Sequence, residues 1–384
     1  MDLTDLFSRL SREPDFDAPE LQAHDAADLL LLETAAEDLG PSGFGSLAPG
    51  DLAVVGDRHG ALTLGAAVLG AEGIRTHQDP LLGERALRAN AARVQREPAG
   101  GPPGYTSHPL GEDLLAGARV VLVQLPRGLD ALDEIAWSVA RWAAPEVRVY
   151  AGGRVKHMSL GQNAVLSKYF GEVRAGLARR KARVLTAGSP QAPGPAPFPR
   201  WGSDPDVPFR IAAHGATFGG PTLDRGSRLL LRGLASAAPD AERIVDLGCG
   251  NGVLAVAAAL ARPGARVIAT DQSSAAVAAS RLTASAAGVG ERVEIHRADA
   301  LEAVPDGWAE LILLNPPFHT GATVHAGIAH RLIRACRGAL VPGGELRLVF
   351  NSHLRYRPLV EREIGPVRQL ARDRAFTVIA AERR

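Results

Sequence analysis

The order of apolar runs along the chain predicts strands that alternate with helices. In the first half, apolar strands are predicted at 51–55 and 120–125, and each is followed by a segment with the apolar spacing of a helix. The second half repeats this order, with strands predicted at 243–247, 266–270, 293–297, 311–314 and 345–350. Because strands buried on both faces are continuously apolar, this order predicts an α/β fold with doubly wound, mostly parallel sheets.

Helical spacing and chain breakers mark the other elements. Helices are predicted at 21–39, 61–69, 83–94, 129–142, 253–260 and 324–340, and weaker strands end near 79, 150 and 381. Asp224 is placed to cap a leucine-rich helix, and Pro342-Gly343-Gly344 predicts a turn before the strand at 345. Residues 1–20 contain two prolines, so we expect a loosely held arm.

A proline-rich segment divides the chain near its middle. Prolines recur throughout 188–208, which favours an extended, semi-rigid linker. With 384 residues, the chain is long for one domain and comfortable for two. We therefore expect one domain at 1–187 and a second at 209–384.

The two halves can be aligned with each other. Placing Gly60 on Gly252 also brings together three further pairs, which are Gly56 with Gly248, Leu62 with Leu254 and Asp79 with Asp271. With a one-residue gap, Gln124-Leu125-Pro126-Arg127 meets Asn315-Pro316-Pro317-Phe318. We interpret this alignment as an old duplication, and chance similarity between two sheets of one fold class is the alternative.

Several polar or glycine positions of the second half are changed in the first. Val54 stands where the second half has Asp246, and Arg58 stands where it has Gly250. The first half therefore lacks a carboxylate and a glycine at positions that the second half retains. We expect the first domain to be non-catalytic and to support the second domain.

Composition and charge constrain the environment more than the function. The net charge of +1 neither implies nor excludes nucleic acid, because a local basic face can exist on a neutral chain. Cys249 and Cys336 lack the spacing of metal ligands, so we expect no metal site and a reducing compartment. The sequence shows neither a signal peptide nor an apolar run of membrane-spanning length. A cytoplasmic protein without a membrane partner is expected.

The glycine turn 248–252 lies between a predicted strand and a predicted helix. Glycines at alternate positions let the backbone approach a ligand closely, and the helix start offers free N–H groups. Asp271, at the end of the next strand, is placed to bind ribose hydroxyls. Asp299, at a third strand end, is placed to accept from an adenine amine, although a surface aspartate before a turn fits that position equally well. Together these positions predict a site for a nucleoside cofactor.

The stretch Asn315-Pro316-Pro317-Phe318-His319 ends the apolar strand at 311–314. Its two prolines lack N–H donors, so this strand end presents carbonyl oxygens, one amide and one aromatic ring. A planar substrate with an exocyclic amine needs acceptors for its two N–H groups and a ring that stacks on its face. Acceptors that hold both protons favour the attacking geometry of the nitrogen. The alternative is a proline-rich loop that only closes a strand.

A basic run occupies 174–183 and contains Arg179, Arg180 and Lys181. One interpretation is the solvated face of a helix. The other is a set of phosphate contacts, to which Lys156 and His157 would contribute.

The second half resembles class I S-adenosylmethionine-dependent methyltransferases that modify exocyclic nitrogens. The similarity is narrower with the guanine-N2 methyltransferases of ribosomal RNA, both the C type for the small subunit and the G type for the large subunit. It is based on the glycine turn and its acids and on four stretches, which are Asp224-Arg225-Gly226-Ser227, Asn315 to His319, Gly343-Gly344-Glu345-Leu346 and Asn351 to Tyr356. Residues 21–28 resemble the start of the large-subunit type, which we favour.

The resemblance implies two tandem Rossmann-like class I methyltransferase domains, of which the N-terminal one is degenerate. It implies the cofactor S-adenosylmethionine, with its amino-acid end at Asp246, Gly248, Gly250 and Gly252, its ribose at Asp271 and its adenine at Asp299 and Ala300. It also implies a catalytic group formed by Asn315, Pro316 and Phe318. The substrate pocket that it implies is lined by Pro317, His319 and Phe218.

The reaction that the resemblance implies is methylation of guanine N2 in ribosomal RNA, either naked or within a ribosomal subunit, by a monomer without a metal. The first domain would then help hold the RNA, with the basic run, Lys156 and His157 as phosphate contacts. Two alternatives remain open. The same acceptor motif serves adenine N6 and glutamine N5 methylation, and the protein could instead be a non-catalytic RNA-binding factor in ribosome assembly.

Overall fold

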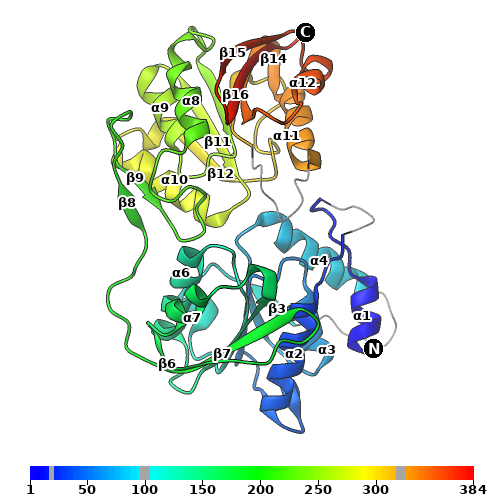
Figure 1. Cartoon of the computed structure of the whole chain (residues 1–384). Helices are drawn as coiled ribbons and strands as arrows, with labels where there is room; N and C mark the ends of the chain where they lie inside the picture. The colour runs from blue at the N-terminus through cyan, green and yellow to red at the C-terminus, as the bar shows by residue number, and fades with distance from the viewer. Residues whose placement is uncertain (17–20, 96–103, 317–325) are drawn as a thin grey trace. The chain divides into compact units, whose positions relative to one another are not determined.

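The computed structural model describes residues 1–16, 21–95, 104–316 and 326–384 (Figure 1). The chain forms two compact units, Met1–Phe198 and Pro199–Arg384. The division falls inside the segment 188–208 that we expected as a linker. Strand residues lie within that segment on both sides of the division, because β7 extends to Pro190 and β8 spans Arg200–Gly202.

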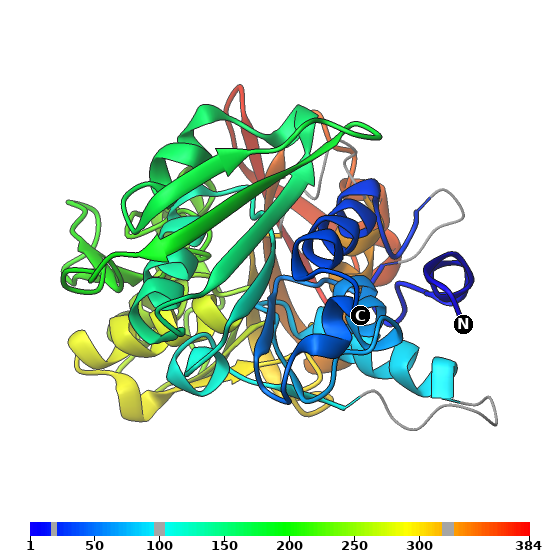
Figure 2. The ribbon, with the colours of Figure 1, turned by 90° about the horizontal axis from the view of Figure 1, so that it is seen from below.

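The first unit has a parallel sheet with an antiparallel edge. Its helices are α1 (Leu3–Arg9), α2 (Ala26–Leu39), η1 (Gly43–Ser46), α3 (Ala61–Val68), α4 (Leu81–Gln95), α5 (Glu112–Leu115), α6 (Leu129–Trp142), η2 (Val155–His157) and α7 (Leu160–Leu166). Its strands are β1 (Leu52–Val55), β2 (Ile74–His77), β3 (Tyr105–Ser107), β4 (Val120–Gln124), β5 (Arg148–Arg154), β6 (Phe170–Ala175) and β7 (Ala182–Pro190). Within the described residues they form a seven-stranded sheet of order β3-β2-β1-β4-β5-β7-β6. Helices cover the sheet, and β6 and β7 form a long antiparallel hairpin (Figure 2).

The second unit repeats this architecture. Its helices are α8 (Arg225–Arg232), η3 (Leu234–Ser236), α9 (Val253–Ala261), α10 (Ser274–Ala286), η4 (Gly290–Arg292), α11 (Ala326–Ala339) and α12 (Arg357–Glu363). Its sheet strands are β10 (Arg243–Leu247), β11 (Arg266–Asp271), β12 (Val293–Arg297), β13 (Ala309–Leu314), β14 (Leu340–Asn351), β15 (Val367–Arg372) and β16 (Phe376–Glu382), and β8 (Arg200–Gly202) pairs with β9 (Ile211–Ala213).

The described strands of the second sheet have the order β12-β11-β10-β13-β14-β16-β15, which is the order of the first sheet element by element. The prediction of two tandem α/β domains of one fold is therefore confirmed, and the common order supports a duplication.

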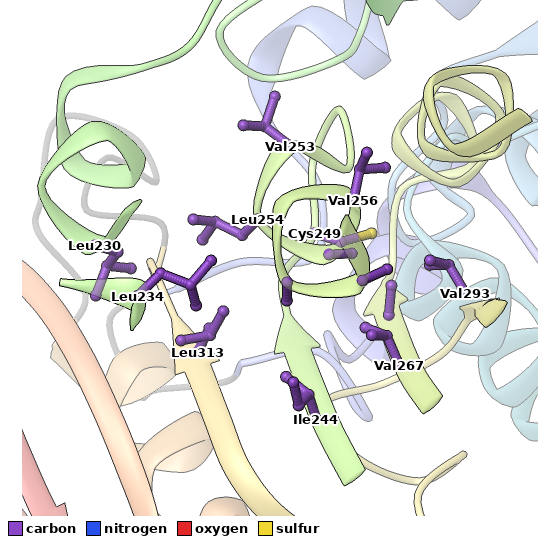
Figure 3. Close-up of a cluster of buried hydrophobic side chains, with 14 of the residues drawn as sticks. Leu230, Leu234, Ile244, Cys249, Val253, Leu254, Val256, Val267, Val293 and Leu313 are labelled. Atoms are coloured by element: carbon purple, nitrogen blue, oxygen red, sulfur yellow. The ribbon is translucent and has the colours of Figure 1, made fainter. Parts of the chain in front are cut away.

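Alternate residues of β10 and β13 pack into two hydrophobic cores on opposite faces of the second sheet. Ile244 and Leu313 contribute to the core beneath α8 and α9, whereas Val245 and Leu314 contribute to the core beneath α11. Figure 3 shows side chains from α8, α9 and the neighbouring strands converging in the first of these cores. Continuous apolar strands are required here because both faces are covered.

Three local expectations were wrong. Residues 3–9 do not form a loose arm, because Asp2 caps α1 and this helix buries Leu6 and Phe7. The basic run is no helix face, since it spans β6, a loop and β7. The last parallel strand begins at Leu340 rather than at 345, and a register shift against β13 accommodates the predicted turn residues within it.

Candidate functional site

The glycine loop after β10 has the conformation that only a glycine-rich turn adopts easily. The φ angles of Gly248, Gly250 and Gly252 are 77°, 56° and 80°, in the left-handed region that disfavours side chains. A Cβ at Gly252 would lie 2.9 Å from the backbone of Ser280, so this position has no room for one. A Cβ at Gly250 would meet nothing within 4 Å. The loop therefore leaves open space at Gly250, where a ligand can approach the backbone.

Asp246 lies on β10 beneath the start of α9. Its Oδ2 accepts the N–H of Ala255 at 2.9 Å, whereas its Oδ1 is buried without a hydrogen-bond partner among the described residues. Burial raises the pKa of Asp246 to about 7, and the neighbouring carboxylate of Asp271 contributes to this rise. A buried acceptor without a partner is costly unless a ligand supplies a donor.

Asp271 and Asp299 lie at neighbouring strand ends, but their surroundings differ. Asp271 accepts the N–H of Gly250 at 3.0 Å and thereby connects the end of β11 with the glycine loop. Asp299 forms a two-pronged ion pair with Arg331 of α11, with both N–O distances at 2.9 Å. No sequence pattern pointed to this arginine. Ala300, which follows Asp299, has a φ of 49°.

Asn315 lies at the end of β13, which is the direct neighbour of β10 in the sheet. Its Nδ2 donates to the carboxylate of Asp224, at 3.3 and 3.2 Å, and to Ser227 Oγ at 3.1 Å. Asn315 is half-buried and Pro316 is buried. The sequence predicted Asp224 only as a helix cap, and its contact with an asparagine 91 positions away was not foreseen.

The segment that carries Phe218 is tied to the glycine loop. Asn251 Nδ2 donates to the carbonyl oxygens of Gly220, at 3.0 Å, and Thr222, at 2.9 Å. Phe218 itself is 73% exposed. Asn251 was not predicted as a site residue, although it lies within the glycine motif.

Two of the predicted pocket residues, Pro317 and His319, and one predicted catalytic residue, Phe318, lie outside the described residues. Their roles, like those of the other predicted site residues, stay predictions.

The corresponding loop of the first unit has a different polar arrangement. Arg58 adopts a φ of 54°, close to the 56° of the glycine at the equivalent position in the second unit. Val54 replaces the buried aspartate, and Asp57 instead accepts from the N–H groups of Leu62 and Thr63 at 2.7 and 2.8 Å. Burial raises the pKa of Asp57 to about 6. A side chain of the protein thus occupies the start of α3, which a ligand would need.

The predicted RNA contacts are placed on the first unit. Arg179 and Arg180 pair with Glu37 and Glu33 of α2, at 3.8 and 3.0 Å, while Lys181 continues the loop between β6 and β7. These exposed pairs offset part of the positive charge of the loop.

Lys156 and His157 lie in η2 at the end of β5. The pKa of His157 is lowered by desolvation of its ring and by the positive charges of Lys156, Arg127, Arg154 and Arg58. Lys156 therefore belongs to a larger basic group than the sequence suggested.

Within the described part of the chain, no group of three or more potential metal-binding side chains occurs. No helix in the described ranges is long and apolar enough to cross a membrane.

Comparisons with known proteins assign both units to protein families. Residues 1–191 match the family described as RLMG N-terminal domain, and residues 208–380 match the family described as Methyltransferase small domain. The chain is 36% identical over 377 residues to the ribosomal RNA large subunit methyltransferase G of Pseudomonas entomophila, with 97% of each chain covered. It is 35% identical over 380 residues to the Streptomyces coelicolor protein of that name, again with 97% of each covered. The chain belongs to the ribosomal RNA large subunit methyltransferase G family.

Among solved structures, a T. thermophilus 16S rRNA methyltransferase (RsmC) in complex with AdoMet and guanosine aligns over 100% of both chains. The TM-score is 0.75 and the sequence identity is 21%, so this likeness concerns the fold. The resemblance to tandem-domain ribosomal RNA methyltransferases, drawn from the sequence, is confirmed by the family assignment.

The cofactor of this methyltransferase family is S-adenosylmethionine, and the second unit fits it. The unpartnered Oδ1 of Asp246 suits the ammonium of the cofactor's amino-acid end. The open space at Gly250 suits close backbone contact. In the first unit, Arg58 and Asp57 occupy the equivalent loop.

Proposed function

We propose that this protein transfers a methyl group from S-adenosylmethionine to the exocyclic N2 of a guanine in large-subunit ribosomal RNA. The proposal rests on the position of the Asn315 amide. Its Oδ1 receives no hydrogen bond from a described residue, and it lies at the end of β13, the direct neighbour of the strand β10 that leads into the glycine loop. An acceptor for an amine beside a cofactor loop is the arrangement that N-methylation needs. The names of the relatives support ribosomal RNA of the large subunit as the substrate.

The cofactor is assigned to the carboxyl edge of the second sheet, where open α/β sheets bind ligands. Asp246 and the three loop glycines hold its amino-acid end, Asp271 holds its ribose, and Asp299 with Ala300 holds its adenine. The ion pair with Arg331 fixes the carboxylate of Asp299 for this role.

Catalysis rests on alignment and on hydrogen-bond acceptors. The cofactor supplies a methyl group on a sulfonium, which is already an activated leaving group. Asn315 Oδ1 and the carbonyl oxygen of Pro316 accept the two N–H groups of the guanine amine, and Phe318 stacks on the base. The nitrogen becomes positively charged as the new bond forms, so these acceptors hold its protons more strongly then than before. The excess proton leaves to water, and the site needs no strong base.

Nucleoside mass spectrometry tests the proposal. The purified protein is incubated with labelled cofactor and with RNA or ribosomal subunits from cells that lack the gene. Label in N2-methylguanosine of large-subunit RNA is the expected result. Label only in N6-methyladenosine or in protein would assign the enzyme to adenine or glutamine, and tight cofactor binding without any label would favour an assembly factor.

Cofactor binding is expected to strengthen as the pH rises to about 7. In the free protein Asp246 has a pKa of about 7, and only its carboxylate form binds an ammonium, so below that pH binding must expel a proton. Affinity should then fall by up to about tenfold per pH unit on the acid side. Calorimetry in two buffers of different ionisation enthalpy measures the released proton.

The same carboxyl group makes the stability of the cofactor-free protein change with pH in the opposite direction. Its native pKa lies above the unfolded value of about 4, so the native state binds more protons and the free energy of unfolding falls as the pH rises from about 4 to about 7. Asp246→Asn should remove both trends and weaken cofactor binding. An unchanged pH profile in this variant would contradict the assignment.

RNA binding is expected to depend on the loop between β6 and β7. Replacing Arg179, Arg180 and Lys181 by Ala should weaken binding by about 3- to 10-fold and reduce the slope of log K against log salt by about 1 to 2. The effect is moderate because Glu33 and Glu37 already offset two of these charges.

A matched pair of substitutions tests this loop from the other side. Replacing Glu33 and Glu37 by Gln should tighten RNA binding, since it frees the arginines. Affinity and salt slope that stay the same in both variants would remove this loop from the RNA-binding surface. Binding through Lys156 would then have to be tested separately.

We also propose that the protein is a monomer, that it is located in the cytoplasm and that it has no membrane partner.

A further inference from the structure

The side chain of Asn315 is held from one end only. Its Nδ2 donates to both carboxylate oxygens of Asp224 and to Ser227 Oγ, while no described residue donates to its Oδ1. A carboxylate can only accept, so this contact decides which end of the amide is the nitrogen. The opposite end must then be the oxygen, which is the atom that the amine of the substrate needs.

We propose that Asp224 is a positioning residue for methyl transfer, which orients Asn315 so that Oδ1 faces the reacting amine. The inference rests on the proposed function, in which this oxygen accepts from the amine. Asp224 acts through Asn315 and does not itself contact the substrate. Ser227 supports the same orientation with a weaker, reversible contact, because a hydroxyl can also donate.

Asp224 is itself fixed by the start of α8. Its Oδ1 accepts the N–H of Gly226 at 2.8 Å, and its Oδ2 accepts the N–H of Ser227 at 3.2 Å. A Cβ at Gly226 would lie only 3.0 Å from Asn315 Oδ1, so glycine leaves this oxygen its space. The helix cap and the amide contact thus share one carboxylate.

The negative charge of Asp224 also has an electronic consequence. A carboxylate that accepts from Nδ2 polarises the amide and makes its oxygen a stronger acceptor. The effect grows as positive charge develops on the substrate nitrogen, so it favours the transition state over the ground state. Loss of the charge should therefore lower kcat rather than weaken binding.

The first unit contains a related contact without an exposed acceptor. Gln124, which aligns with Asn315, donates its Nε2 to Asp28 Oδ1 at 2.8 Å, and Asp28 lies in the first turn of α2 behind the cap Asp25. The Oε1 of Gln124 is buried with no partner among the described residues. The link between strand end and helix start is thus shared by both units, but only the second leaves a half-buried amide at its site. A test must therefore separate positioning from a purely structural link.

Asp224→Asn separates the two roles, because asparagine caps helices as well as aspartate does. This variant should keep its thermal midpoint and its affinities for cofactor and RNA, while kcat falls by about 100-fold, the usual effect of a misplaced catalytic group. Asp25→Asn in the first unit is the matched control, since it changes the equivalent cap and should leave kcat unchanged. A kcat of Asp224→Asn equal to that of the wild type would overturn the proposal.

Exchanging the two side chains provides a second test. In the double variant Asp224→Asn with Asn315→Asp, the amide at 224 donates to the carboxylate at 315. The contact is therefore restored with donor and acceptor exchanged, and an oxygen at 315 again faces the reacting amine. The double variant should turn over at least about tenfold faster than Asn315→Asp alone, which places two carboxylates in contact. A double variant no faster than that single variant would argue against positioning.

A readout independent of turnover distinguishes this inference from the proposed function. In NMR spectra of the full chain, the side-chain NH₂ signal of Asn315, assigned by its loss in Asn315→Ala, should be protected from solvent exchange in the wild type and should exchange faster in Asp224→Asn, which offers one acceptor oxygen instead of two. If the wild type methylates no guanine, the proposed function fails while this signal still reports on the contact. Equal protection in both proteins would overturn the positioning role.

Discussion

Asn315→Ala is expected to lower kcat for methyl transfer by about 100- to 1000-fold, the cost of losing one well-placed hydrogen-bond partner of the developing charge. The amide contributes its Oδ1 to the substrate amine, and its Nδ2 contacts only Asp224 and Ser227 among the described residues. Cofactor affinity should therefore stay within about twofold of the wild type. Single-turnover kinetics with saturating RNA, combined with cofactor calorimetry, measures both quantities.

Gln124→Ala is the matched control for this result. It removes the aligned amide of the first unit, which contacts Asp28 and takes no part in the proposed site. Turnover measured well below the unfolding temperature should be retained. If Asn315→Ala kept full turnover, or if both variants lost activity equally, the acceptor role of Asn315 would be refuted.

Gly250→Arg is expected to abolish cofactor binding without unfolding the second unit. The first unit already has an arginine, Arg58, at the equivalent position with nearly the same φ, so the backbone tolerates this side chain. The left-handed conformation should cost about 1 kcal/mol. The new side chain would enter the open space at Gly250, and we expect no saturable binding even at about 100 times the wild-type Kd, a loss of more than about 2.7 kcal/mol.

Arg58→Gly is the converse variant. It should not create a second cofactor site, because Asp57 still occupies the start of α3 and Val54 offers no carboxylate. Calorimetry should find one cofactor per chain in this variant and none in Gly250→Arg. Normal binding by Gly250→Arg would show that the cofactor does not use this loop.

The repeated sheets were predictable because their signal is local. Continuous apolar runs such as 311–314 must be buried on both faces, and a glycine turn between strand and helix needs positive φ angles. The internal alignment of Gly60 with Gly252 extended this local signal to a repeated domain, which the common strand order supports. The β6–β7 hairpin was missed, because its exposed basic residues do not show the apolar alternation of a half-buried strand.

The sequence by itself determined the fold class and the candidate loops, since each depends on residues close together in the chain, and its internal alignment predicted the repeated domain. Only the tertiary structure decided which polar atoms meet. It paired Asp299 with Arg331, and it brought Asp224 to Asn315 across 91 positions. Such contacts depend on how strands and helices pack, and no local pattern encodes them. In the second unit the fold therefore brings Asp224 and Asn315, which the sequence identified separately, into contact, and it adds Arg331, to which no sequence pattern pointed.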